Sequence, residues 1–187
     1  MPTQAAEILS LCPAIKNLVC WVQQEDRPEL PPLIRALPPH RLSIEHGHFS
    51  NIVVPDSDAP TLFPDLTHLE LIFWNVAEDG LQLTQRLVQD LRKLPRLTHL
   101  ILSESVRRAR IEPIISALPN LAVVVVATDM EEDLPDNLAR VVVPTSSAEY
   151  KQDHWEIYHS EEDNLWVRAE RIIAAREAST AAEESEV

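Results

Sequence analysis

One phrase recurs five times along this chain: an apolar residue, a proline and then an alternating apolar run. It is clearest in Leu94-Pro95-Arg96-Leu97-Thr98-His99-Leu100-Ile101-Leu102. The copies occupy residues 12–18, 37–44, 63–71, 94–102 and 118–126, and successive prolines from the second copy onward lie 25, 31 and 24 residues apart. Self-similarity at such a period indicates stacked units that share one core, because a single unit of this size cannot bury its apolar face.

The spacing Leu-x-x-Leu-x-Leu within the phrase is typical of leucine-rich repeats. Strands that are joined by helical crossovers run parallel, and such crossovers are right-handed. We therefore predict an α/β fold: a right-handed leucine-rich-repeat-like solenoid with a parallel sheet on one face, helices on the other and a C-terminal capping helix. Its expected parts are the solenoid (1–143), a capping loop and helix (144–178) and a disordered acidic tail (179–187).

Apolar periodicity places the individual elements. The expected strands cover 17–22, 41–45, 67–73, 98–102, 121–127 and 137–143. The expected helices cover 5–11, 29–37, 80–94, a segment near 111–118, and 163–177, whose apolar stripe contains Leu165, Trp166, Ala169, Ile172 and Ile173. Residues 46–62 are rich in turn-forming residues, so we expect an irregular connection there.

Composition limits the partners. The net charge of −14 repels phosphate backbones, which argues against nucleic acid. The chain has only two glycines, which argues against phosphate-binding loops because such loops need backbone without Cβ atoms. The sequence shows neither a secretory signal nor an apolar run long enough for a membrane, and its two cysteines are interpreted as reduced core thiols. We therefore expect a cytoplasmic or nuclear location and no membrane partner.

Alternation along the strands predicts which side chains point away from the helices. They form a second sheet face, and the predicted partner-binding residues on it are Trp21, Arg41, His68, Glu70, Ile72, His99, Ile101, Val123 and Val125. The C-terminal end of this face is apolar. An exposed apolar patch marks an interface; alternatively, the helix around Trp166 folds over the patch and buries it. The sequence leaves both possibilities open.

His68 and His99 occupy equivalent positions in adjacent repeats and should be neighbours, with Glu70 the nearest further ligand type. A zinc site needs three or four ligands, so the count is too low to predict a metal. No catalytic or phosphate-binding motif occurs. The leading hypothesis is a non-catalytic protein–protein interaction module without a cofactor; a small metal-dependent enzyme built on these three residues is the weaker alternative.

Three segments also resemble a known family. The runs 63–71 and 94–100, together with the closing Trp166-Val167-Arg168-Ala169-Glu170, are similar to the F-box/leucine-rich-repeat-like proteins of mushroom-type fungi. The resemblance implies an intracellular receptor that holds a target on its repeats and docks on a ubiquitin ligase adaptor through an F-box. The chain shows only the repeat region, so a substrate-recognition part of such a receptor is the second functional hypothesis.

Overall fold

A computed structural model describes residues 4–22, 28–53, 62–73, 80–103, 111–127, 140–142 and 164–185. These residues form an α/β structure with one six-stranded sheet, in which strand order follows chain order and every pair is parallel. The strands are β1 (Asn17–Cys20), β2 (Arg41–Glu45), β3 (His68–Ile72), β4 (His99–Ser103), β5 (Val123–Ala127) and β6 (Val141–Val142).

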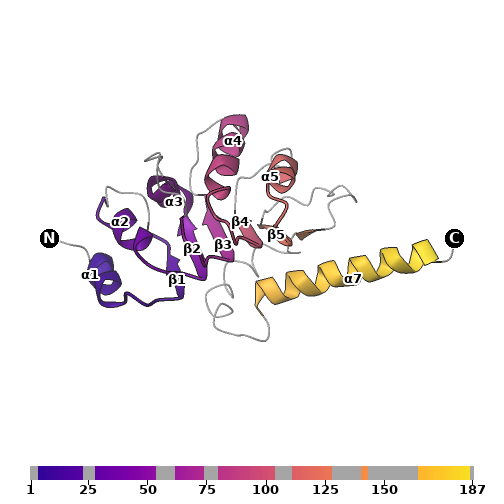
Figure 1. Cartoon of the computed structure of the whole chain (residues 1–187), viewed down its shortest axis with the longest axis horizontal. Coiled ribbons are helices and arrows are strands. Elements are labelled where there is room, and N and C mark those ends of the chain that lie inside the picture. The colour runs from indigo at the N-terminus through magenta and orange to yellow at the C-terminus, as the bar shows by residue number, and fades with distance from the viewer. Residues whose placement is uncertain are drawn as a thin grey trace.

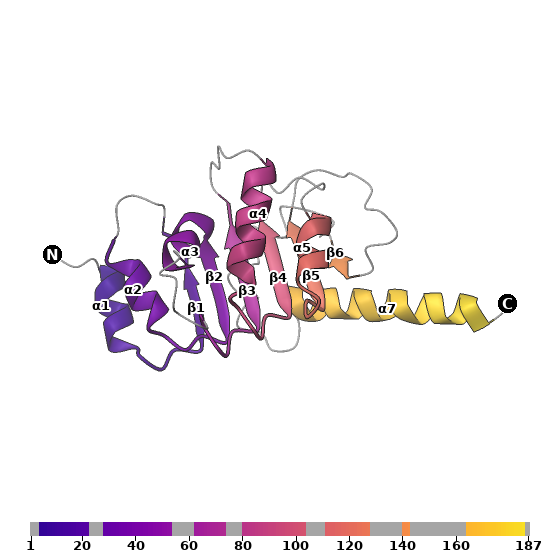
Figure 2. The ribbon, with the colours of Figure 1, turned by 45° about the horizontal axis from the view of Figure 1, so that its top comes forward.

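The helices lie on both sides of this sheet. They are α1 (Gln4–Leu11), α2 (Leu30–Arg35), α3 (His46–Val53), α4 (Gly80–Leu91), α5 (Ile111–Ala117) and α7 (Leu165–Ser185). Helices α3, α4 and α5 cover one face, whereas α7 crosses the opposite face near β4 and β5 and then runs beyond the sheet (Figure 1). Figure 2 shows the strands in sequence order from β1 to β6 and the long projecting end of α7.

The recurrent phrase fixes the strand register. One backbone carbonyl just before a strand accepts hydrogen bonds from two successive N–H groups of the next repeat. The acceptors are the carbonyl oxygens of Lys16, His40, Thr67 and Thr98, at donor distances of 2.7 to 3.2 Å. The first residues of β1 to β5 consequently align as Asn17, Arg41, His68, His99 and Val123.

Two separate apolar clusters follow from this alignment. The main core lies between the sheet and the first five helices and contains the leucine ladder Leu42, Leu69 and Leu100, each at most 1% exposed. The second cluster lies under α7 and joins Ile101, Val123, Val125 and Val142 to side chains of that helix. The predicted alternation of side chains between the two faces is therefore confirmed.

Three predictions about local structure are wrong. Residues 46–53 form α3 because the carboxylate of Glu45 accepts the His48 N–H (2.9 Å) and Phe49, Ile52 and Val53 supply a buried stripe. The tail is helical as far as Ser185. Cys12 is exposed, although Cys20 lies in the core.

The capping helix is also placed differently from the prediction. Instead of closing the end of the stack, α7 packs across the second face against β5 and β6. No described helix combines the length and apolar character needed to cross a membrane.

The leucine ladder yields a stability prediction. Leu69→Ala or Leu100→Ala should lower the free energy of unfolding by about 2–5 kcal/mol, because each leaves a cavity in a closed core. Leu81→Ala, at a side chain that is 66% exposed on α4, is the matched control and should change it by less than about 0.5 kcal/mol. Denaturant titration monitored by circular dichroism measures all three. Equal losses at core and control positions would contradict the assigned faces.

Candidate functional site

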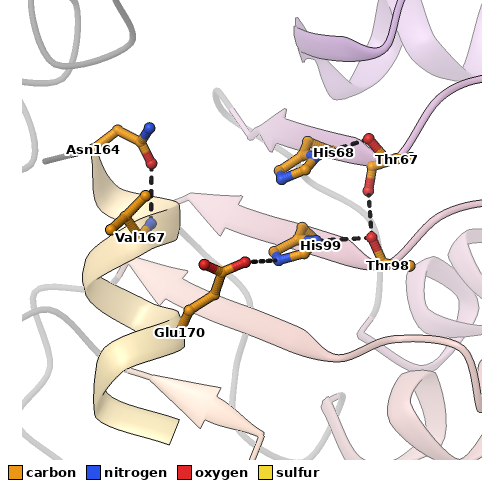
Figure 3. A network of polar contacts seen from close by, with 7 residues as sticks. All are labelled: Thr67, His68, Thr98, His99, Asn164, Val167 and Glu170. Carbon is orange, nitrogen blue, oxygen red and sulfur yellow. Dashed lines mark hydrogen bonds and ion pairs between the residues drawn. The ribbon is translucent and has the colours of Figure 1, made fainter. Parts of the chain in front are cut away.

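The second face of the sheet holds a pair of stacked histidines at its centre. His68 on β3 and His99 on β4 are paired in register, and their rings lie 4.1 Å apart at an angle of 9°. The two Thr-His dipeptides explain the matching orientation, since Thr67 and Thr98 each hold the Nδ1 atom of the following histidine at 2.8 Å (Figure 3). The repeat therefore places two imidazoles face to face.

Helix α7 closes over this pair. The ring of Trp166 meets both imidazoles edge-on, at 5.1 Å from His68 and 5.6 Å from His99. Glu170, one turn further along α7, accepts a hydrogen bond from His99 Nε2 (2.9 Å), as Figure 3 shows. Because a carboxylate can only accept, this bond makes Nε2 of His99 the protonated nitrogen, and Nδ1 of a neutral ring then accepts from the Thr98 hydroxyl.

The start of α7 is fixed by its own cap. Asn164 Oδ1 accepts the Val167 N–H at 3.0 Å, which satisfies one of the unpaired donors of the first turn. From there the spacing of Trp166, Ala169 and Ile173 presents one stripe to the sheet. Arg176 adds a bond from its guanidinium to the carbonyl oxygen of Val141 on β6 (2.6 Å).

Burial shifts the protonation of both histidines. The pKa of His68 falls from 6.5 to about 3, mainly because the ring is desolvated and further because His99 and Arg41 lie nearby. Desolvation also lowers the pKa of His99, while the hydrogen bond and the charge of Glu170 raise it and Arg41 lowers it. Both rings are therefore neutral at pH 7, which suits their stacked arrangement.

A chain of hydrogen bonds links the other half of the face. Trp21 Nε1 donates to Ser43 Oγ (2.6 Å), and Ser43 donates to Glu70 Oε2 (2.5 Å). Ser43 and Glu70 are fully buried, whereas Trp21 and Arg41 remain partly exposed. Glu70 thus belongs to a polar network with Ser43 on β2 and Trp21, which directly follows β1.

The predicted exposure of Glu70, Ile72 and His99 on the second face is accordingly wrong. His99 is 9% exposed, and the others are buried at 7% or less: Glu70, Ile72, Ile101, Val123 and Val125. For Ile101, Val123 and Val125 the cause is α7, so of the two possibilities that the sequence left open, the structure has the one in which the helix covers the patch. Trp21, Arg41 and His68 stay partly accessible.

The same geometry argues against a metal at the histidine pair. Nearly parallel stacked rings direct their nitrogens side by side instead of toward one point, and three of the four nitrogens contact Thr67, Thr98 or Glu170. Glu70 bonds Ser43. Among the described residues, no three His, Cys, Asp or Glu side chains are arranged to bind a metal ion.

Sequence reasoning missed Glu170 and Arg176 as contacts of the face. The signal that could have found Glu170 is its spacing, because it follows Trp166 by four residues and so lies beside it on the same helical surface. Ile172, assigned to the buried stripe, is 42% exposed.

Comparison with known proteins found no matching family model, curated protein or solved structure.

Acidification tests the buried histidine. Between pH 6.5 and pH 3 the unfolded chain binds a proton at His68 and the folded chain does not, so the free energy of unfolding should fall as pH falls. The slope contributed by one such group is at most about 1.4 kcal/mol per pH unit. His68→Phe, which keeps a ring in the stack, should remove that contribution, as shown by denaturant titrations at pH 7.5 and pH 5.

His40, an exposed histidine of the preceding repeat, supplies the matched control. His40→Phe should leave the difference in unfolding free energy between the two pH values as it is in the original chain. If His68→Phe changes that difference no more than His40→Phe does, the buried ring does not oppose protonation.

Proposed function

We propose that this chain is a non-catalytic protein-interaction module of the leucine-rich-repeat kind, which receives a partner protein on the β1–β3 half of the second sheet face. The observation that carries the proposal is the division of this face. Its β4–β6 half lies under α7, while Val19, Trp21 and Arg41 remain partly exposed on the other half. The accessible side chains of this half lie along β1, just after it and at the first residue of β2, because Ser43, Glu70 and Ile72 beside them are buried.

The backbone supports the repeat assignment. The strands follow one another in parallel order. At each step from β1 to β5, one carbonyl oxygen before a strand accepts hydrogen bonds from two successive N–H groups of the next repeat, a contact that we call the two-donor carbonyl step. Stacked repeats require both features. Each repeat contributes one strand, and its side chains stand about 4.8 Å from those of the next. Surfaces of this type serve as extended binding faces.

The histidines support a structural role in preference to chemistry. His68 and His99 are the residues on this face best suited to acid–base work, yet their contacts are to neighbouring threonines, to each other and to α7. A general base needs to reach a substrate proton within hydrogen-bonding distance. Here Glu170 already occupies Nε2 of His99 and Trp166 covers both rings.

Residue type indicates how the open half binds. Tryptophan and arginine dominate the energetics of protein interfaces, because they combine a large contact area with directed polar groups. Ser43 holds the Trp21 indole in place through its N–H, which reduces the conformational entropy lost on binding. Arg41 is a cation on a chain of net charge −14, so the partner is expected to place a carboxylate beside it.

Two substitutions test this surface. Trp21→Ala and Arg41→Glu should each weaken partner binding by at least about 30-fold, the effect of losing a contact worth about 2 kcal/mol. Affinity purification with the original chain identifies the partners, and calorimetric titration with the purified partner measures the loss.

Leu81→Ala serves as the control because Leu81 is exposed on α4, a helix of the opposite face. It should retain the partner fully. Arg41→Glu is the more decisive of the two variants, since Trp21→Ala also removes the bond to Ser43. Partner binding that survives both substitutions would reject the β1–β3 half as the interface.

A further inference from the structure

Helix α7 is only half docked. Its first nine residues supply Trp166 (3% exposed), Ala169 (0%) and Ile173 (7%) to the second cluster. From Ala174 to Ala182, by contrast, every side chain is exposed, and Figure 2 shows this part of the helix projecting past the sheet. Arg176 bonds the carbonyl oxygen of Val141 from this part of the helix, but the apolar contact of α7 with the sheet ends at Ile173.

The contact of α7 with the sheet is also incomplete in its hydrogen bonding. Trp166 Nε1 is buried and has no acceptor among the described residues. A buried unpaired donor is unfavourable, because the indole N–H gives up its bond to water and gains no other acceptor in exchange. The Glu170 carboxylate that bonds His99 is 52% exposed, so water competes for it.

The site beneath α7 does not share residues with the main core. Its sheet residues Ile101, Val123, Val125 and Val142 belong to the second cluster, whereas the leucine ladder belongs to the first. Departure of α7 would uncover a continuous apolar surface and leave the packing between the sheet and the other helices as it is. A surface of this kind on a folded protein is a place for another apolar element to bind.

We propose that the β4–β6 half of the second face is a binding site for an amphipathic helix of a partner protein, and that α7 occupies this site until the partner displaces it. The inference rests on the proposed interaction function and extends it to the class of partner. Because the site is continuous with the β1–β3 half through the His68–His99 pair, one partner can engage Trp21 and Arg41 and insert its helix in the place of α7.

The seated α7 defines the chemistry of the partner helix. It carries a large apolar ring, a small residue three positions later, a carboxylate four positions later and an aliphatic residue seven positions later, which is the pattern of Trp166, Ala169, Glu170 and Ile173. Phenylalanine or leucine at the first of these positions would fill the same space without burying an unpaired N–H. Such a helix lays its apolar stripe into the site as helix-in-groove ligands do.

A labelled peptide of residues 164–185 is the probe, and the full-length chain is the receptor. In the original chain the attached α7 competes with the peptide; in a full-length Trp166→Ala variant that competitor is weakened, so more of the protein has an open site. The Trp166→Ala chain should bind the peptide at least 10-fold more tightly than the original chain does in fluorescence anisotropy. A peptide that itself carries Trp166→Ala should not bind either chain.

Cooperative thermal unfolding confirms that the variant is folded, and full-length Ile173→Ala, a smaller truncation of the same stripe, replaces it if it is not. Failure of a folded variant to bind the peptide, or equal binding by the original chain and the variant, overturns the inference. Neither result bears on the β1–β3 half, which the Trp21 and Arg41 substitutions test separately. Loss of partner binding in those variants without peptide exchange would leave the proposed function standing and reject the helix site.

Discussion

The two-donor carbonyl step between repeats is the constraint on which the rest of this structure depends. At Lys16, His40, Thr67 and Thr98 the same backbone atom binds two successive N–H groups of the following repeat. A shift of one residue in this register would move every side chain to the other face of the sheet. The step therefore decides which residues enter the main core and which face α7.

In-register stacking turns single residues into ladders with a common environment. On the core side this produces uniform leucine packing from β2 to β4. On the second face the polarity of the side chains decreases from β2 to β5. Ser43 and Glu70 are polar, His68 and His99 are intermediate in polarity, and Ile101 and Val125 are apolar. This gradient explains where α7 binds, because its apolar stripe gains most from covering the valine end and Glu170 meets the last polar side chain before it.

The histidine pair marks the border between the covered and the accessible half. Stacked neutral imidazoles can contact an apolar ring on one side and a carboxylate at the edge, and His99 does both through Trp166 and Glu170. Desolvation keeps both rings neutral by lowering their pKa values. The structural role of the two histidines follows from their position beside α7, since side chains at the same place on the sheet would face solvent if α7 were absent.

Much of the fold could be predicted from residue periodicity. The strand at 41–45 has the predicted bounds, the helix that begins at Gly80 begins where expected, and the shared positions of His68 and His99 made them neighbours. Helix α3 was missed because Gly47 and the two histidines beside it are typical of a turn. The contact that starts the helix, between the Glu45 carboxylate and the His48 N–H, depends on where β2 ends. The buried state of Glu70 was missed for a similar reason: its partner Ser43 belongs to another repeat.

The sequence by itself determined the parallel strands, their order and the two faces, because local alternation and a recurring phrase specify backbone pairing and side-chain direction. Only the tertiary structure decided which half of the second face is accessible. That outcome depends on an amphipathic helix that could have capped the end of the stack or projected into solvent. Its docking depends on one apolar stripe and on hydrogen bonds from His99 to Glu170 and from Arg176 to Val141, which join residues far apart in the chain. Against them stands the buried indole N–H of Trp166, which has no acceptor among the described residues.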